Sequence, residues 1–360
     1  MENLTITETN SQVGISQAWE GVRKAKPGIR IREAAAALDL SEAQLLATTV
    51  GTEATRLKPH WPELLQRLPT LGRVMSLTRN DACILEHKGD FQKVNVFGSG
   101  DHKMATVIGP IETRVFLKSW HVAFAVEQKK DDRLLTSIQV FDHEGHAITK
   151  LYLQEKSDYQ AYHQLVNDFR AVNQSAEQPV SDYAPETFTD AIDKDELLSD
   201  WSALKDTHDF FPMLKKHKVH RYDAVELAKG KFSYRIDSKH IQTLLEKAAV
   251  QKLPIMIFAG NRGNLQIHQG RVRTIRMLER GHTGIERWLN VLDPDFNMHL
   301  RMDLIETSWV VRKPTSDGEV TSIECYDKNR DLAVQFFGPR KPGIAELGDW
   351  KKLVNEIEKL

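Results

Sequence analysis

The sequence predicts an α+β fold made of two tandem copies of one unit, each with helices first and a large antiparallel sheet after them. Residues 136–142 (TSIQVFD) match residues 321–327 (TSIECYD), and residues 80–89 match residues 261–270. The two offsets, 185 and 181, are close to half of the 360-residue chain. In both halves the apolar residues change from a helical spacing to an alternation with period two. A duplicated unit explains these matches better than chance similarity between strands.

The first copy is expected over residues 1–171. Apolar residues at helical spacing predict helices at 15–26, 31–38, 41–48 and 60–68, and Ser41 is expected to cap the third of them. From residue 72 on, alternating runs bounded by Gly, Asp and Asn predict strands at 74–78, 83–87, 93–97, 112–117, 120–126, 134–141 and 147–153.

A segment rich in Ser, Gln and Pro, residues 172–188, is expected to link the first copy to the second copy at 189–360. Helices are predicted in the second copy at 194–217, 221–228, 238–251 and 345–360. Strands are predicted at 255–259, 265–269, 272–278, 298–301, 305–313, 320–327 and 332–337.

Composition narrows the class of protein. The chain has 49 basic and 50 acidic residues, so it lacks the overall positive field of a protein that coats nucleic acid. No apolar run approaches the ~18–20 residues that span a bilayer, and residues 1–12 lack the pattern of a signal peptide. The two cysteines, Cys83 and Cys325, do not have the spacing of a zinc site. We therefore expect a soluble, cytoplasmic protein.

The predicted helix at 196–216 contains the most informative histidine. Its apolar residues are spaced by four, three, four and three positions, and His208 falls in this stripe. The stripe alone favours a hydrogen-bonded histidine in the core, whereas Pro212 loosens the helix and favours a ligand site. Three other histidine groups are expected to be structural or solvated: the turn 142–146 (DHEGH), His217 and His220.

The run DTHDFFPMLKKH (206–217), followed by Arg221, resembles the cytoplasmic haem-utilisation proteins of Gram-negative bacteria of the HemS/ChuS/PhuS type. The segments at 27–40, 71–91 and 108–117 and the C-terminal stretch share this resemblance, which covers nearly the whole chain. It implies haem b as ligand or substrate, in a cleft between the two copies. It also implies an inner-membrane haem importer and a downstream haem oxygenase or reductase as partners.

The resemblance also implies roles for individual residues. His208 would be the axial ligand of the haem iron, with Arg114 on the opposite face. The remaining expected residues are Arg221, Lys313 and Arg340 beside the propionates, Gln335 on a polar wall, Phe337 where relatives often carry tyrosine, and His87 as an alternative ligand. A neutral imidazole suits ferric iron, and arginine and lysine suit carboxylates.

The function stays open among three readings. A haem carrier and a haem-degrading oxygenase both fit, because a distal arginine permits either storage or oxidative ring opening. A DNA-binding role for the helix pair at 31–48 is disfavoured, since the second of these helices is poor in Lys and Arg. One haem per chain is expected, because no histidine precedes His60 and Lys26 occupies the place that corresponds to His208.

Overall fold

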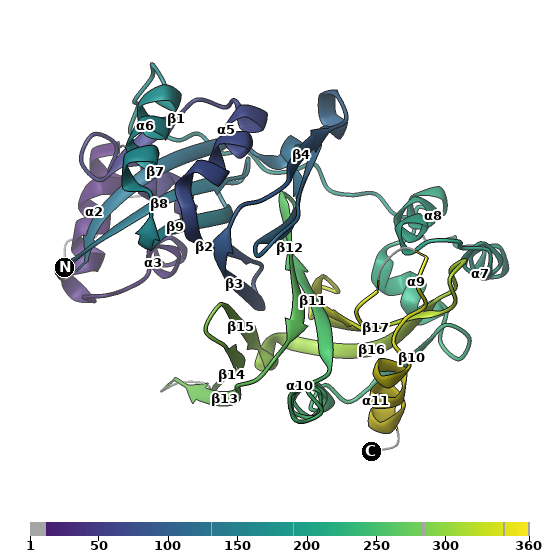
Figure 1. Cartoon of the computed structure of the whole chain (residues 1–360). Coiled ribbons are helices and arrows are strands. Elements are labelled where there is room, and N and C mark those ends of the chain that lie inside the picture. Colours follow the sequence, from purple (N-terminus) through teal and green to yellow (C-terminus); the bar gives the residue numbers. More distant parts are fainter. Residues whose placement is uncertain (1–11, 131, 190, 282–284, 341–342, 359–360) are drawn as a thin grey trace. The chain divides into compact units, whose positions relative to one another are not determined.

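The computed structural model describes residues 12–130, 132–189, 191–281, 285–340 and 343–358. The chain forms two compact units, each coloured mainly by one half of the sequence in Figure 1. Unit 1 contains Met1–Thr78, Lys88–Ala184 and Asn261–Asn264, and unit 2 contains Arg79–His87, Pro185–Gly260 and Leu265–Leu360. None of the helices in the described ranges has both the length and the apolar character needed to cross a membrane.

Unit 1 begins with helices and ends with one. The helices are α2 (Gln12–Ala25), α3 (Ile31–Ala37), α4 (Glu42–Ala47), α5 (Trp61–Arg67) and α6 (Tyr159–Phe169). Ser41 caps α4 as expected: its hydroxyl accepts from the backbone N–H of Gln44, whose side chain accepts from the N–H of Ser41. Trp19 and Leu45 pack α2, α3 and α4 together, so the helix pair expected at 31–48 belongs to a packed group of three helices.

The strands of unit 1 lie in two antiparallel groups. The first, in spatial order, is β1 (Ala54–Leu57), β7 (Val122–Lys130), β8 (Arg133–Phe141), β9 (Ala147–Ser157) and β2 (Gly72–Arg79). The second is β4 (Val94–Phe97), β5 (Met104–Val107) and β6 (Glu112–Phe116).

Unit 2 has the same kind of construction. Its helices are α7 (Lys194–Ser202), α8 (Phe210–Lys216), α9 (Arg221–Leu227), α10 (His240–Val250) and α11 (Gly348–Glu358). One group of strands is β10 (Ser233–Ile236), β16 (Ile305–Lys313), β17 (Val320–Asp327), β18 (Leu332–Phe337), β11 (Pro254–Gly260) and β12 (Asn264–Arg271). The other is β3 (Cys83–Asp90), β15 (Phe296–Arg301), β14 (Glu286–Leu292) and β13 (Ile275–Arg280). Single 3-10 turns lie at Leu68–Leu71, Gly100–His102, Leu117–Ser119, Thr207–Asp209 and Met302–Leu304.

The two units share one topology, which confirms the tandem repeat. The order β1-β7-β8-β9-β2 in unit 1 recurs as β10-β16-β17-β18-β11 in unit 2. Along the chain, the first strand of the group is followed by a helix in each unit, α5 after β1 and α10 after β10. The last strand along the chain is also followed by a helix, α6 after β9 and α11 after β18. Even an isolated parallel bridge recurs, Val50–Ala54 in one unit and Lys229–Ser233 in the other. The expected α+β class with large antiparallel sheets is therefore confirmed.

The single helix expected at 194–217 is wrong. Helix α7 ends at Ser202, and α8 starts at Phe210 after the 3-10 turn Thr207–Asp209 (η4). The side chain of Asp206 accepts from the backbone N–H of His208 and so starts a new helical segment instead of continuing the old one. Pro212 then falls in the first turn of α8, where proline is tolerated.

The sequence interpretation also missed several short elements: strands β1, β5, β10 and β14 and helix α6. Strands β1 (ATRL) and β10 (SYRI) have only four residues each, too few to establish an alternation in the sequence. Both are held by pairing with a longer neighbour, β7 and β16 respectively.

Candidate functional site

Three of the expected site residues in unit 2 meet at a carboxylate that the sequence interpretation did not single out. Glu324, in β17, is fully buried. Arg221 donates to it from Nε at 2.9 Å and from Nη2 at 2.7 Å, so the pair is bidentate. Lys313 donates from Nζ at 2.8 Å and Gln335 from Nε2 at 3.0 Å. We call these four residues the Glu324 cluster.

The register of the sheet brings this cluster together. Glu324 in β17 stands opposite Gln335 in β18. Ser322 and Tyr326 lie two residues on either side of Glu324 on the same face, and their hydroxyls donate to it at 3.1 and 2.6 Å. Arg221 is the first residue of α9 and reaches the strands from there. The carboxylate thus accepts six hydrogen bonds and has no need of a further donor.

The charges of the cluster do not cancel. Burial alone would raise the pKa of Glu324, but the nearby Arg221 and Lys313 cations hold that pKa well below its usual range. Burial lowers the pKa of Lys313 to about 8, although Glu324 opposes this shift. With one carboxylate and two cations, the cluster carries a net charge of about +1 at neutral pH, and the Arg221 side chain is 24% exposed.

Phe210 joins the cluster to helix α8. Its buried ring has the Arg221 guanidinium 5.0 Å and the Lys313 ammonium 4.6 Å from its centroid, so both cations make cation–π contacts with one ring. Trp201 of α7 packs edge-on against the same ring at 4.6 Å. Phe211 follows His208 by three positions in the apolar stripe of the predicted helix, and this spacing predicts a buried side chain; Phe211 is 60% exposed, so this expectation is wrong.

His208 does not lie on a buried helix face as the stripe predicts. It lies in η4, and its side chain is 94% exposed, because the chain breaks between α7 and α8 and turns this residue outward. Its Nδ1 is 2.6 Å from Oδ1 of Asp206. Asp206 has a lowered pKa, chiefly because it accepts from the backbone N–H of His208, and is therefore ionised at neutral pH. An ionised carboxylate only accepts, so Nδ1 carries a proton, and in the neutral imidazole Nε2 is the nitrogen whose lone pair is available to a ligand.

Arg340 lies close to the same carboxylate. Its Nη2 is 3.6 Å from Oδ2 of Asp206 and 3.7 Å from Oδ2 of Asp317. Its Nη1 is buried and has no hydrogen-bond partner among the described residues. A buried guanidinium N–H without an acceptor lowers the stability of the fold, because it has lost its hydrogen bonds to water. This N–H can therefore donate a hydrogen bond to an anionic group of a ligand.

Two other expected residues lie apart from these contacts. Phe337, at the end of β18, packs edge-on against Phe258 with ring centroids 5.0 Å apart. Arg114 belongs to unit 1, in β6, where Nη2 bonds Oε1 of Glu112 at 2.9 Å and part of the side chain remains exposed. The expected placement of Arg114 opposite His208 stays a prediction.

His87, the expected alternative ligand, is buried in unit 2 and both of its ring nitrogens are engaged. Gln266 donates to Nδ1 at 2.8 Å, so Nε2 carries the proton and donates to Nδ1 of His268 at 3.3 Å. Burial lowers the pKa of His87 to about 3 and that of His268 to about 4, so both rings are neutral. His268 stacks on Phe296 at 3.7 Å, and its Nε2 is buried without a partner among the described residues. Iron binding at His87 would require this pair to open.

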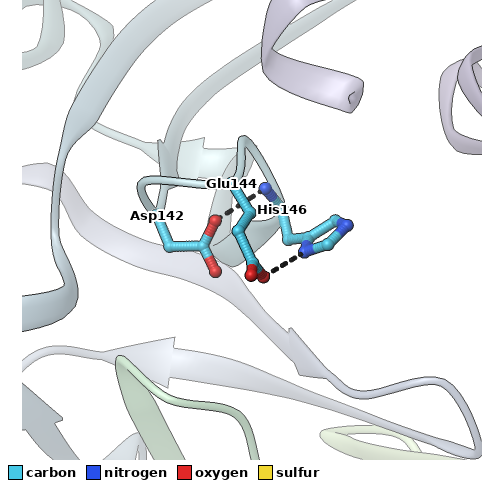
Figure 2. A group of neighbouring side chains, drawn as sticks. All are labelled: Asp142, Glu144 and His146. Carbon is cyan, nitrogen blue, oxygen red and sulfur yellow. Dashed lines mark hydrogen bonds and ion pairs between the residues drawn. The ribbon is translucent and has the colours of Figure 1, made fainter. Parts of the chain in front are cut away.

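Within the described ranges, two further groups bring three potential metal ligands within 4.8 Å. Asp142, Glu144 and His146 lie in the turn between β8 and β9 (Figure 2). There Asp142 is buried and accepts from the backbone N–H of His146, while Glu144 pairs with the His146 ring at 3.3 Å. The contacts of Asp142 and Glu144 thus serve the turn itself, and the exposed His146 agrees with the expected solvated turn.

The second group, Glu196, Asp200 and His217, already holds a cation. Lys216 donates from Nζ to Asp200 at 2.6 Å and lies 3.1 Å from Glu196. His217 bonds Asp200 at 2.7 Å, and the Nδ1 of His220 accepts from the backbone N–H of Tyr222 at the start of α9. Both histidines are therefore structural, as expected.

The sequence interpretation missed Glu324 and Asp206, the two carboxylates that hold the expected residues in place. Glu324 lies in TSIECYD, where the first copy has Gln139 in TSIQVFD. A charge at an interior position of a predicted strand, between the apolar Ile323 and Cys325, was the available signal. Asp206 stands two residues before His208, the spacing of a side chain that caps a turn.

Comparisons with known proteins show which family this chain resembles. The profile of the haemin-degrading HemS/ChuX domain matches residues 39–169 and 218–357. The hemin transport protein HmuS of Yersinia pestis is 31% identical over 95% of this chain and 96% of that protein. The structure of holo-PhuS, a heme-binding protein from Pseudomonas aeruginosa, has a TM-score of 0.90 and 42% identity, covering 96% of this chain and 98% of its own.

A second solved relative is the heme-degrading enzyme ChuS of Escherichia coli O157:H7. Its TM-score is 0.84 and its identity is 29%, over 96% of this chain and 99% of that chain. The profile covers more than half of the chain in two segments, one in each half, as a duplicated unit requires. The chain therefore belongs to the HemS/ChuX family of haemin-degrading proteins.

Proposed function

We propose that this protein binds one haem in the cytoplasm, with Nε2 of His208 on the iron, and carries imported haem to its next use or to degradation. The observation that carries the proposal is the Asp206–His208 pair: Nδ1 is held by the carboxylate, and the exposed ring offers Nε2, when neutral, as the kind of nitrogen that ferric haem binds. The family membership and the solved relatives described as binding or degrading heme support the same ligand.

The residues of unit 2 fit the anionic part of haem. Arg221 belongs to a cluster with a net charge of about +1, and Arg340 has a buried N–H without an acceptor. Two propionates would supply acceptors for both. Lys313 is 3% exposed and bonded to Glu324, so its contribution is electrostatic and acts through the cluster. Gln335 likewise bonds Glu324, and so it holds the carboxylate in place.

Arg114 of the first copy is the residue proposed for the opposite face of the haem. When bound, haem supplies an iron centre that can react with oxygen and a reductant. The role of the protein is to hold the iron through His208, to anchor the propionates and to place a guanidinium over the open face. An inner-membrane haem importer as donor, and a haem oxygenase or reductase as acceptor, belong to the same proposal.

The second candidate function is enzymatic haem degradation. It is favoured by the description of the family as haemin-degrading and by a relative described as a heme oxygenase, ChuS, at 28% identity and TM-score 0.84. The two candidates differ in turnover. Haem-loaded protein is treated with an electron donor under air, with and without catalase, and the Soret band is followed. Decay that persists with catalase and releases a tetrapyrrole identifies an enzyme, whereas a stable Soret band identifies a carrier.

Replacement of the ligand tests the binding proposal itself. His208→Ala should shift the Soret band and reduce haem affinity by more than the about 10- to 100-fold typical of losing an outer-shell partner, because the iron loses its protein ligand itself. His163→Ala is a matched control, since His163 is also an exposed histidine beside a carboxylate, Glu127, at 3.6 Å. An unchanged spectrum in His208→Ala would refute His208 as the ligand.

A further inference from the structure

Asp206 contacts two of the residues that carry the proposed function. Its Oδ1 accepts from Nδ1 of His208 at 2.6 Å and from the backbone N–H of His208 at 2.8 Å. Its Oδ2 lies 3.6 Å from Nη2 of Arg340. The two oxygens of one carboxylate therefore face the proposed iron ligand and a proposed propionate anchor.

The contacts to His208 fix both the tautomer and the direction of the ring. The backbone contact holds η4 against Asp206, and the side-chain contact places the proton on Nδ1. The imidazole then has a single orientation in which Nε2 points away from the carboxylate. An exposed histidine without such a contact would rotate freely and exchange between its two neutral tautomers.

A carboxylate in this position also changes the electron density of the ring. The hydrogen bond draws the Nδ1 proton toward oxygen, which increases the negative charge on the imidazole and at Nε2. Carboxylate–histidine pairs have this effect on metal ligands in general. Ferric iron has one more positive charge than ferrous iron, so it gains more from a stronger donor.

We propose that Asp206 is a positioning residue that acts on haem iron through His208, holding Nε2 toward the iron and favouring ferric over ferrous haem. This inference rests on the proposed function, because it requires His208 to bind the iron. The guanidinium of Arg340 lies beside the other oxygen, with Nη2 3.6 Å from Oδ2.

The test is the reduction potential of the haem-loaded protein. Asp206→Asn keeps an oxygen that can accept from the backbone N–H of His208, and so preserves the cap, but it removes the charge. Affinity for ferric haem should fall about 10- to 100-fold, with a smaller loss for ferrous haem. A tenfold difference between the two oxidation states raises the midpoint potential by about 59 mV for this one-electron couple. The iron–histidine stretching band of the ferrous form should move to lower frequency.

Two variants serve as matched controls. Asp209→Asn removes the same charge three residues away, from a side chain that accepts from the backbone N–H of Asp206 at 2.9 Å. Asp317→Asn removes the other carboxylate near Arg340, at 3.7 Å. Both should leave the potential within the error of the native value.

The outcomes separate the two levels of the proposal. If His208→Ala leaves the haem spectrum unchanged, the proposed function fails at its ligand, and this inference fails with it. If His208 is the ligand but Asp206→Asn shifts the potential no more than Asp209→Asn, only the inference is overturned.

Nitrogen NMR of the native protein without haem provides a measurement that needs no variant. The proton should reside on Nδ1 of His208, and finding it on Nε2 would overturn the inference.

Discussion

Glu324 is the residue whose environment most changes the interpretation of its neighbours. Taken from the sequence, Arg221 and Lys313 are two free cations for two propionates. In the structure one buried carboxylate accepts from both of them, and Lys313 has almost no exposed surface. Arg221 keeps exposed surface and is therefore the member of the cluster that a ligand can reach.

Glu346 is a second buried carboxylate, and it should make the stability of the protein depend on pH. It is 7% exposed, and its oxygens lie 3.0 and 3.1 Å from the backbone nitrogen of Thr321. Burial raises its pKa to about 7 from 4.5, so the folded state binds more protons than the unfolded state between these values. The associated stability is fully present below pH 4.5 and is lost as the pH rises through 7.

Glu346→Gln should remove the loss of folding stability that the native protein shows as the pH rises. At pH 8 the variant should be more stable than the native protein, by about 3 kcal/mol or less, and the two should converge toward pH 4.5. Urea unfolding at pH 5, 6, 7 and 8 measures the difference. Glu306→Gln, which removes an exposed carboxylate, is the control. Identical pH profiles for native protein and Glu346→Gln would contradict the prediction.

At the scale of elements, helix α11 depends on a close contact with the end of β18. A Cβ on Gly338 would lie 2.7–2.8 Å from three side-chain atoms of Trp350, which is fully buried and donates from Nε1 to the carbonyl of Thr321 at 2.9 Å. The rigid indole cannot move without losing that bond. Gly338→Ala should therefore destabilise the protein by about 1–3 kcal/mol, as overpacking does elsewhere.

The control for this substitution lies in the same helix. A Cβ on Gly348, the first residue of α11, would meet no atom within 4 Å. Gly348→Ala should be neutral or slightly stabilising, because alanine favours a helix. Urea denaturation compares the two variants, and an equal effect at both positions would show that the close approach to Trp350 is unimportant.

The elements α9 and β18 supply the proposed propionate anchors, Arg221 at the start of one and Arg340 just after the other. Haem dimethyl ester, which lacks both charges, should bind the native protein at least about tenfold more weakly than haem, since charged hydrogen bonds are worth ~1.5–3 kcal/mol. In the double variant Arg221→Ala/Arg340→Ala the difference should shrink. Equal affinities of the native protein for haem and its diester would exclude the anchors.

At the scale of the whole molecule, the repeat raises the question of a second haem. The positions that match Lys313, Glu324 and Gln335 at an offset of 185 are Gln128, Gln139 and Lys150. Lys150 is buried and paired with Glu42 of α4, so its charge is already neutralised. Unit 1 thus lacks the uncompensated positive charge of the Glu324 cluster, and no histidine precedes His60.

We therefore expect one haem per chain. A titration with haemin followed at the Soret band, together with native mass spectrometry, should show a single break at one equivalent. A sharp break at two equivalents would contradict this and would point to His87, whose pairing with His268 would then have to open.

The sequence by itself determined the class, the duplication and most of the longer strands. Alternation of buried and less buried positions is local information, and in β2, β3 and β11 it persists long enough to be recognised. The motif around His208 also identified the family, since it depends on residue types in order. Short strands such as β1 and β10 escaped, because their stability comes from the neighbour with which they pair.

Only the tertiary structure decided how the candidate site is organised. The stripe of apolar residues continues across Ser202 and Phe210, so it cannot reveal that Asp206 starts a new turn and exposes His208. Four of the six hydrogen bonds to Glu324 come from the consecutive strands β16, β17 and β18, whereas the two from Arg221 come from α9, 103 positions away in the chain. Burial, the direction of a side chain and the pairing of charges depend on contacts between distant segments. Spacing in the sequence does not record such contacts, because they exist only once the strands have aligned in register.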